Sequence, residues 1–306
     1  MKAALQRWDV WFYAAMPAER LALLRLGVGL YALIYLVSRA FHLNAPVRYP
    51  ASSFAPIGIV RLIEQPLPSQ WVYALFGSAV LTGALFTLGI AYRLVAPLFA
   101  LLLLWVLSYR HSWGMIFHTD NLLWLHVALL ALAPAADVYA WGKQASSPAA
   151  RSREQGSYGW AIRSMCLVTV ASYVVAGAAK LSITGWSWAG GHALREQIAY
   201  DALRKIELGS IHSPFGPWLL PLEWLFAPLS SFSLAVELLA PVALLGGRLA
   251  TTWCISAWLF HLGVLVLMAI AFSYPLSGCA FLAFFPIERA FGALQARLRA
   301  ARGPAT

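Results

Sequence analysis

Long apolar runs alternate with short polar segments along almost the whole chain. A helix needs about 20 mostly apolar residues to cross the hydrocarbon core of a bilayer. Eight windows meet or approach this length, at roughly 21–41, 71–90, 93–110, 118–135, 160–181, 228–246, 250–271 and 273–290. The last two are separated only by "SYP", so they form either a tight hairpin or one broken helix. The pattern predicts an all-α, polytopic bundle of about eight transmembrane helices.

The segment between 182 and 227 is the largest and most mixed of the connections. Its stretch "GGHALREQIAYDALRKIE" predicts an amphipathic helix on the outer surface. The following "SPFGPWLLPLEWLFAP" contains four prolines. Since proline interrupts helical hydrogen bonding, we expect this part to be bent or re-entrant rather than one straight span.

Composition excludes a soluble domain. Of the 306 residues, 61% are hydrophobic and only 11% are charged, which is too little polar surface for a soluble protein of this length. The net charge of +10 does not indicate nucleic-acid binding, because most of the excess Lys and Arg lies in loops and at the termini. The three cysteines lie in apolar runs without a CxxC motif, so neither a disulfide framework nor a cysteine metal site is expected.

The distribution of basic residues predicts the orientation. With both termini in the cytoplasm, most of the 22 Lys and Arg residues fall on the cytoplasmic side, as the positive-inside rule requires. We therefore expect a multi-pass protein of the inner (cytoplasmic) membrane. Its predicted parts are a cytoplasmic segment at 1–20, a transmembrane domain at 21–290 and a basic cytoplasmic tail at 291–306.

Ionisable side chains inside spans are the default functional candidates, because they are costly there unless they pair or face a wet cavity. Arg25 lies early in the first span and is interpreted as reaching back to the cytoplasmic headgroups. The full set is Arg25, His118, Asp120, His126, Lys180, Glu237 and His261.

Lys180 has two interpretations. Tyr173, Gly177 and Lys180 share one helix face at positions i, i+4 and i+7, and the lysine lies near the outer end of its span. It is either an anchor that reaches the outer headgroups or a lysine in an apolar pocket. Such a pocket favours the neutral amine, which is a usable general base.

The other candidates also have structural interpretations. Asp120 can cap the helix that follows His118, and His126 is interpreted as a hydrogen-bonded packing residue. His261 lies in mid-span without a charged neighbour in sequence. No HExxH motif or paired-histidine spacing is present, so no metal is expected.

Glu237 lies four residues before Pro241, which frees the backbone carbonyl of residue 237 from its helical hydrogen bond. The carboxylate is expected to neutralise a buried cation. The sequence leaves open whether that cation is Lys180 or Arg25.

Four segments in order carry a family resemblance: "AERLALLRLGVGLYALIYL", "HTDNLLWLHVALLALAPAADVYAW", "YVVAGAAKLSITGWSWAGG" and "VELLAPVALLGGRL…WLFHLGVLVLMAIAFSYPLSG". Together, over about 20–290, the chain resembles the horizontally transferred transmembrane (HTTM) domain. This is the membrane domain of the vitamin K-dependent gamma-glutamyl carboxylases and of many bacterial proteins.

The resemblance implies roles for specific residues. Lys180, in "AGAAKL", matches the lysine taken as the base that deprotonates the hydroquinone form of vitamin K. His118 and His261 match two further carboxylase histidines. Asp120 and Glu237 are expected as supporting residues from their own positions in the spans, not from the resemblance. The implied cofactor is a reduced quinone of the vitamin K type. The aromatic residues that either wall a quinone site or form an interfacial belt are Tyr173, Trp186, Trp188 and Trp258.

Two hypotheses remain for the function. One is quinol-dependent epoxidase or carboxylase-type (lyase) chemistry at a pocket on the periplasmic side. The alternative is a non-catalytic membrane accessory or lipid-binding protein. Carboxylases carry a large lumenal domain after the membrane part, and this chain stops soon after its last predicted span, so protein carboxylation is not expected. A transporter is disfavoured because no inverted repeat is evident. The expected partners are the lipid bilayer and a quinol, while substrate, quinone type, protein partner and oligomeric state stay open.

Overall fold

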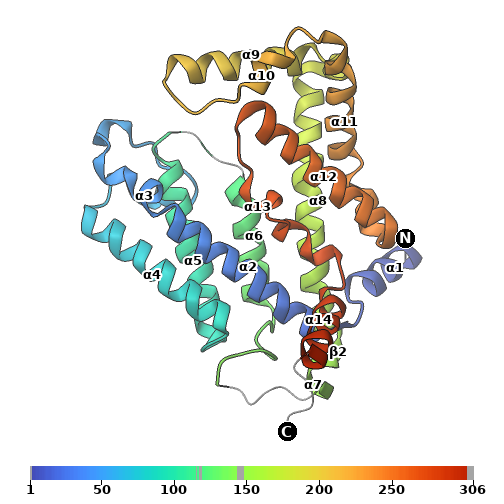
Figure 1. Cartoon of the computed structure of the whole chain (residues 1–306). Coiled ribbons are helices and arrows are strands. Elements are labelled where there is room, and N and C mark those ends of the chain that lie inside the picture. Colours follow the sequence, from blue (N-terminus) through green and yellow to red (C-terminus); the bar gives the residue numbers. More distant parts are fainter. Residues whose placement is uncertain (1, 115, 117–118, 143–147, 302–306) are drawn as a thin grey trace. The chain divides into compact units, whose positions relative to one another are not determined.

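The chain folds almost entirely into helices. The structure is a computed structural model of the whole chain, and it describes residues 2–114, 116, 119–142 and 148–301 (Figure 1). The only strands in these ranges are β1 (Met16–Pro17) and β2 (Glu154–Gln155), which pair antiparallel. The predicted all-α class is confirmed.

Five helices of the described residues are long and apolar enough to cross a membrane. This length and composition identify a multi-pass membrane protein. The five are α2 (Ala18–Ser38), α4 (Ser69–Leu88), α5 (Tyr92–His111), α8 (Gly156–Thr184), whose apolar stretch continues to Gly190, and α12 (Gly247–Met268).

The other three predicted windows contain shorter helices. The window at 118–135 holds α6 (Thr119–Leu132). The window at 228–246 holds α11 (Phe226–Leu238), followed by the 3-10 helix η6 (Ala240–Leu245). Pro241 lies in the first turn of η6, where its missing N–H stops the α-helix from continuing.

The window at 273–290 is not one helix, which corrects the sequence prediction. It contains α13 (Ser273–Leu276), the 3-10 helix η7 (Cys279–Phe284) and the start of α14 (Ile287–Ala301). Gly278 has a positive φ of 79°, which a helix does not accommodate, and it lies between the end of α13 and the start of η7. Pro286 precedes α14. Hydropathy alone does not register these breaks.

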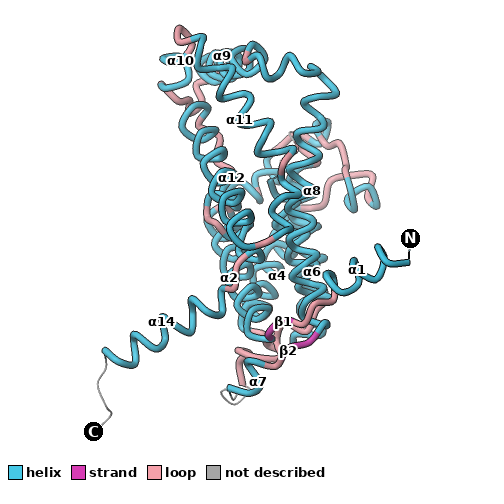
Figure 2. The backbone as a smooth tube through the Cα atoms, turned by 90° about the vertical axis from the view of Figure 1, so that its right-hand side faces the viewer, coloured by secondary structure: helices cyan, strands magenta, loops and turns pink. Residues whose placement is uncertain are grey.

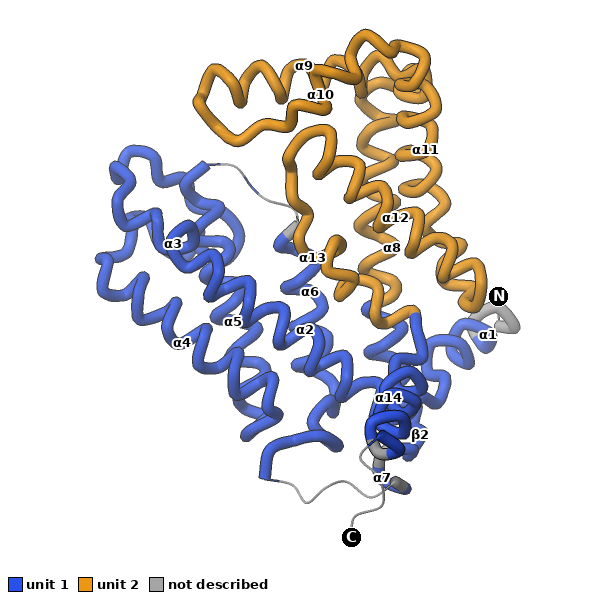
Figure 3. Tube along the Cα trace, in the orientation of Figure 1, with its two compact units in different colours: residues 1–165, 285–306 blue, residues 166–284 orange. Residues whose placement is uncertain are grey.

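The chain forms two compact units, residues 1–165 with 285–306 and residues 166–284 (Figure 3). Unit 1 contains the bundle of α2, α4, α5 and α6, in which α4 packs against α2 and α5, and α6 packs against α5 and α2. Its remaining elements are α1 (Lys2–Phe12), α3 (Ala40–Leu43), η1 (Ala45–Arg48), η2 (Ala51–Ser53), η3 (Gly58–Leu62), α7 (Pro148–Ser152), β1, β2, α14 and the first part of α8.

Glycines allow close helix approach in unit 1. A Cβ at Gly83 in α4 would lie 2.9 Å from the ring of Phe99 in α5, and one at Gly29 in α2 would clash with Thr87 of α4. The α4–α5 turn is tight because Gly89 ends α4 in the left-handed conformation at φ 74°. Ala91 also has a positive φ of 45°.

Unit 2 is built on the second part of α8, together with α11 and α12. The 3-10 helix η4 (Gly185–Gly190) leads from α8 to α9 (His192–Glu207), α10 (Phe215–Leu219) and η5 (Glu223–Leu225). As the four prolines predict, the segment before α11 is bent rather than one straight span. A core of Ile198, Leu219 and Phe226 joins α9, α10 and α11.

Candidate functional site

Lys180 and Glu237 form an ion pair between α8 and α11. The Nζ of Lys180 donates to Oε1 of Glu237 over 2.6 Å. The Glu237 side chain is 4% exposed and that of Lys180 is 21% exposed. The second carboxylate oxygen, Oε2 of Glu237, is buried and has no hydrogen-bond partner among the described residues. The pair therefore retains an acceptor that a ligand hydroxyl can use.

Gly177 makes this pairing possible. It lies one turn before Lys180 on the same face of α8, and a Cβ there would lie 2.9 Å from Cδ2 of Leu238 and 3.0 Å from Cβ of Glu237. The missing side chain lets α11 approach α8 closely. The sequence placed Gly177 on the helix face of Lys180, and the structure shows that α11 packs into the space beside this glycine.

Aromatic rings flank the amine of Lys180. Its Nζ lies 5.0 Å from the centroid of the Trp188 ring and 5.4 Å from that of Phe260, at distances where a ring face attracts a cation. Trp188 is 3% exposed. Two serines of α11 hydrogen-bond to Trp188. The hydroxyl of Ser230 donates to the backbone carbonyl of Trp188, and the indole Nε1 of Trp188 donates to Oγ of Ser233 over 3.3 Å.

A second polar pair lies deeper in unit 2. The hydroxyl of Tyr173 and Nε2 of His261 are 2.7 Å apart, and both residues are buried. Tyr173 precedes Lys180 by two helical turns, so the two pairs lie about 10 Å apart along α8. The ring of Trp253 packs edge-on against Tyr173 with centroids 5.0 Å apart. The predicted His261 and Tyr173 thus contact each other directly.

A small pocket borders this aromatic group. It has a volume of about 220 Å³ and lies between α11 and α12, with Val236, Leu239, Thr252 and Trp253 in its lining. Trp253 therefore contacts both the pocket and Tyr173. Sequence reasoning missed Trp253 and Phe260. Their spacing from His261 on α12 was the available signal, since positions 253, 257, 260 and 261 share one helix face.

The two other tryptophans of the predicted quinone wall lie in different settings. Trp186 is 74% exposed on η4. Trp258 is partly exposed on α12, and its Nε1 donates to the carbonyl of Leu276 over 2.9 Å. Of the four predicted wall residues, Tyr173 and Trp188 are buried beside the two polar pairs.

In unit 1, Asp120 lies in the first turn of α6 and contacts side chains of two other helices. It accepts a hydrogen bond from the hydroxyl of Tyr35 over 2.7 Å, and its other carboxylate oxygen lies 3.1 Å from Nε2 of His111. All three residues are buried. His118, two positions before Asp120, lies outside the described residues. Sequence reasoning singled out neither His111 nor Tyr35.

The remaining intramembrane residues have structural partners. His126 is fully buried with Nε2 3.2 Å from the carbonyl of Met165, as expected for a packing histidine. Arg25 is also fully buried and donates to the carbonyl of Tyr139 over 2.6 Å. Within the described ranges, no group of three His, Cys, Asp or Glu side chains is arranged to hold a metal ion.

The comparisons with known proteins identify one family. The family model described as the HTTM domain matches residues 13–287, which is nearly the whole chain and spans both compact units. No curated protein matches, and no solved structure matches.

Proposed function

Because the chain belongs to the HTTM domain family, we propose that this membrane protein acts on a reduced quinone, with Lys180 as the general base. The observation that carries the proposal is the part-buried pair of Lys180 and Glu237, in which the Lys180 amine lies near the rings of Trp188 and Phe260. A neutral lysine amine beside a carboxylate can accept a proton, because the carboxylate then neutralises the ammonium.

The residues of unit 2 fit a quinol. Aromatic side chains supply flat apolar surfaces, while Lys180 and the free oxygen of Glu237 supply partners for a hydroxyl group. A reduced quinone, when bound, supplies acidic hydroxyl groups and two reducing electrons. The pocket of about 220 Å³ beside Trp253 adds space next to the aromatic group.

The proposed proton transfer follows from the charges. With Lys180 as the neutral amine and Glu237 as the carboxylate, the pair has a net charge of −1. When Lys180 accepts a proton at Nζ, it becomes the ammonium, and Glu237 neutralises it at 2.6 Å. Since a neutral ion pair costs less in an apolar setting than an isolated charge does, Glu237 favours the proton-accepting step. The Tyr173–His261 pair would position the far end of the ligand.

The proposal includes the predicted topology. With the N-terminus in the cytoplasm of the inner membrane, crossings by α2, α4, α5 and α6 return the chain to the cytoplasmic side before α8, so that Lys180 lies toward the periplasmic leaflet. The distribution of Lys and Arg supports this orientation.

The test uses the purified protein in lipid nanodiscs, supplied with a menaquinol and oxygen, with products followed by mass spectrometry. Lys180→Arg is the informative variant, because arginine keeps the charge beside Glu237 but does not release its proton. We expect wild-type turnover and a loss of about 100-fold or more in both Lys180→Arg and Lys180→Ala. Lys205→Ala is the matched control, since Lys205 also forms an ion pair in unit 2, with Asp201 at 2.8 Å.

A second function has one observation in its favour. The pair with Glu237 already gives Lys180 a structural partner, as expected in a non-catalytic accessory module where the pair only holds α11 on α8. Absence of quinol turnover in a folded wild-type protein would favour this module. Turnover that survives Lys180→Arg would reject the role of Lys180 as the base.

A further inference from the structure

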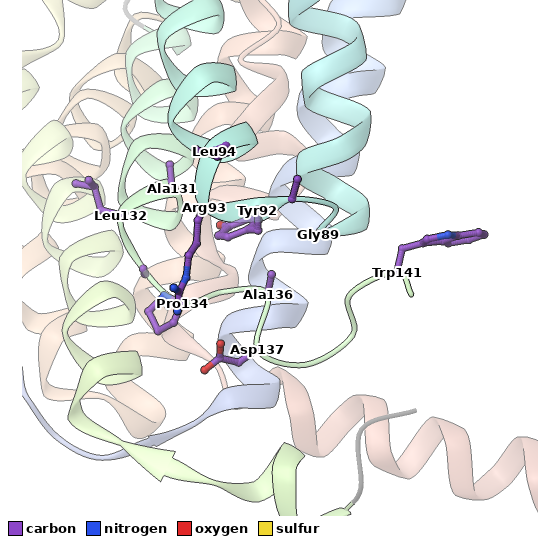
Figure 4. A pocket seen from close by; sticks show the side chains of 12 residues that line it. Gly89, Tyr92, Arg93, Leu94, Ala131, Leu132, Pro134, Ala136, Asp137 and Trp141 are labelled. Atoms are coloured by element: carbon purple, nitrogen blue, oxygen red, sulfur yellow. The ribbon is translucent and has the colours of Figure 1, made fainter. Parts of the chain in front are cut away.

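A large pocket lies in unit 1, far along the chain from Lys180. It has a volume of about 920 Å³ and lies where the α4–α5 turn meets the segment that follows α6. Its lining includes Gly89, Tyr92, Arg93, Ala136, Asp137 and Trp141 (Figure 4). This volume is typical of a pocket for an organic ligand rather than for a single ion.

Positive charge predominates around this pocket. Arg93 is exposed in the lining, and its side chain reaches toward Pro134 (Figure 4). The acidic residue of the lining, Asp137, already accepts a hydrogen bond from Tyr158 over 2.7 Å and lies 3.7 Å from Arg153. Its charge is therefore balanced by another group, while Arg93 stays available to an anion.

A second arginine lies directly behind the wall. Arg25 is fully buried, and its Nε and Nη1 atoms have no hydrogen-bond partner among the described residues. Nη1 packs against Gly89, where an added Cβ would lie 2.0 Å away. The guanidinium also lies near the ring of Tyr92, 5.8 Å from its centroid. Since a buried cation without a counter-charge is costly, an anion in the pocket would stabilise it.

The rim of the pocket is apolar and exposed. Leu94, Leu132 and Trp141 are each more than 70% exposed. Exposed leucines at the end of membrane helices face lipid rather than water, and tryptophan favours the headgroup level of a bilayer.

An amphipathic helix starts beside the pocket. The ring of Phe291 in α14 packs edge-on against Tyr139, with centroids 5.9 Å apart. From there α14 extends away from the bundle of unit 1 (Figure 2), with Leu294 and Leu298 exposed near Arg297. Such a basic amphipathic helix lies in the headgroup region of a membrane. The pocket therefore lies at headgroup depth.

From these observations we propose that the pocket binds the headgroup of an anionic phospholipid. The phosphate contacts Arg93, with Arg25 behind the wall, and the acyl chains leave over Leu94, Leu132 and Trp141. Basic pockets between membrane helices bind anionic headgroups in this way. The bilayer is the source of the ligand because the pocket opens over apolar, exposed side chains. This site is separate from the proposed quinol chemistry.

The test titrates detergent-purified protein with phosphatidylglycerol or phosphatidylcholine and counts bound lipids by native mass spectrometry. We expect a preference for phosphatidylglycerol, and an affinity for it that is about fivefold weaker in Arg93→Gln. Arg248→Gln is the matched control, because Arg248 is also an exposed arginine in the first turn of a long helix. This control should keep the wild-type preference.

Three results would overturn the proposal: equal affinity of the wild type for both lipids, equal losses in Arg93→Gln and Arg248→Gln, or displacement of phosphatidylglycerol by an equal concentration of soluble glycerol phosphate. The last result would assign the pocket to a free phosphate compound. Thermal unfolding without added lipid checks that both variants are folded, and the exposure of both arginines makes this the expected result.

Discussion

Lys180 and Glu237 are buried to different degrees, and this difference predicts unequal effects of removing either one. Lys180→Met leaves a carboxylate that is 4% exposed without its cation, whereas Glu237→Leu leaves an amine that is 21% exposed. Loss of one partner from a buried pair costs about 3–5 kcal/mol. We expect a cost near this range for Lys180→Met, a smaller cost for Glu237→Leu, and a double variant more stable than Lys180→Met.

Thermal or denaturant unfolding in detergent of the wild type, the two single variants and the double variant measures the interaction free energy between the two side chains. Costs that simply add in the double variant would show that the two side chains do not interact energetically.

The sequence identified both members of this pair but not the pairing. Glu237 had two candidate cations, Lys180 and Arg25, because sequence distance says nothing about which helices pack together. The structure pairs Glu237 with Lys180 in unit 2, while Arg25 bonds the Tyr139 carbonyl in unit 1. Trp253 and Phe260 were also missed, because their spacing places them on the helix face of His261 but does not say which residues of other helices that face contacts.

Close contact between α8 and α11 depends on Gly177. An added Cβ would lie within 3.0 Å of Glu237 and Leu238, so Gly177→Ala should separate the two helices and cost about 1–3 kcal/mol. Gly263→Ala in α12 is the matched control, since nothing lies within 4 Å of a Cβ there. It should be neutral or stabilising by up to about 1 kcal/mol.

Unfolding midpoints of the two alanine variants in the same detergent provide the comparison. Equal midpoints would show that α8 and α11 are not closely packed at Gly177.

The sequence correctly predicted those helices that are defined by the length of an apolar run alone. The windows for α2, α4, α5, α8 and α12 correspond to helices long enough to span a bilayer. The prediction failed at 273–290, where Gly278 and Pro286 divide an apolar run into three short pieces. A hydropathy window averages over such residues, although their backbone preferences decide where a helix ends.

At the scale of the whole chain, an ion pair joins residues near its two ends. Arg20, in the first turn of α2, donates through Nε and Nη2 to both carboxylate oxygens of Glu288 in α14, over 2.8 and 2.6 Å. Both residues belong to unit 1 although 268 positions separate them. This bidentate ion pair and the ring contact between Tyr139 and Phe291 attach α14 to the rest of unit 1.

The charge state of Glu288 makes this attachment dependent on pH. Burial opposes ionisation of the carboxyl group, but the hydrogen bonds from Arg20 and the nearby positive charge outweigh it and hold the pKa of Glu288 below its ordinary value. A lowered pKa in the folded state stabilises the fold at every pH above the unfolded value, about 4.3. That stabilisation is lost as the pH falls from there through the folded pKa.

We therefore expect Glu288→Gln to cost about 1 kcal/mol at pH 7 and the same at pH 5.5, with the difference from wild type shrinking below about pH 4. Thermal unfolding of the wild type and the variant across this pH range measures the difference in their stability.

Glu223→Gln is the control, because the Arg195–Glu223 pair at 2.9 Å is largely exposed, and exposed pairs contribute little to stability. A difference for Glu288→Gln that grows as the pH falls would reverse the predicted sign, because only a raised pKa produces that trend. The attachment of α14 would then depend on its apolar contact with Tyr139 rather than on the ion pair.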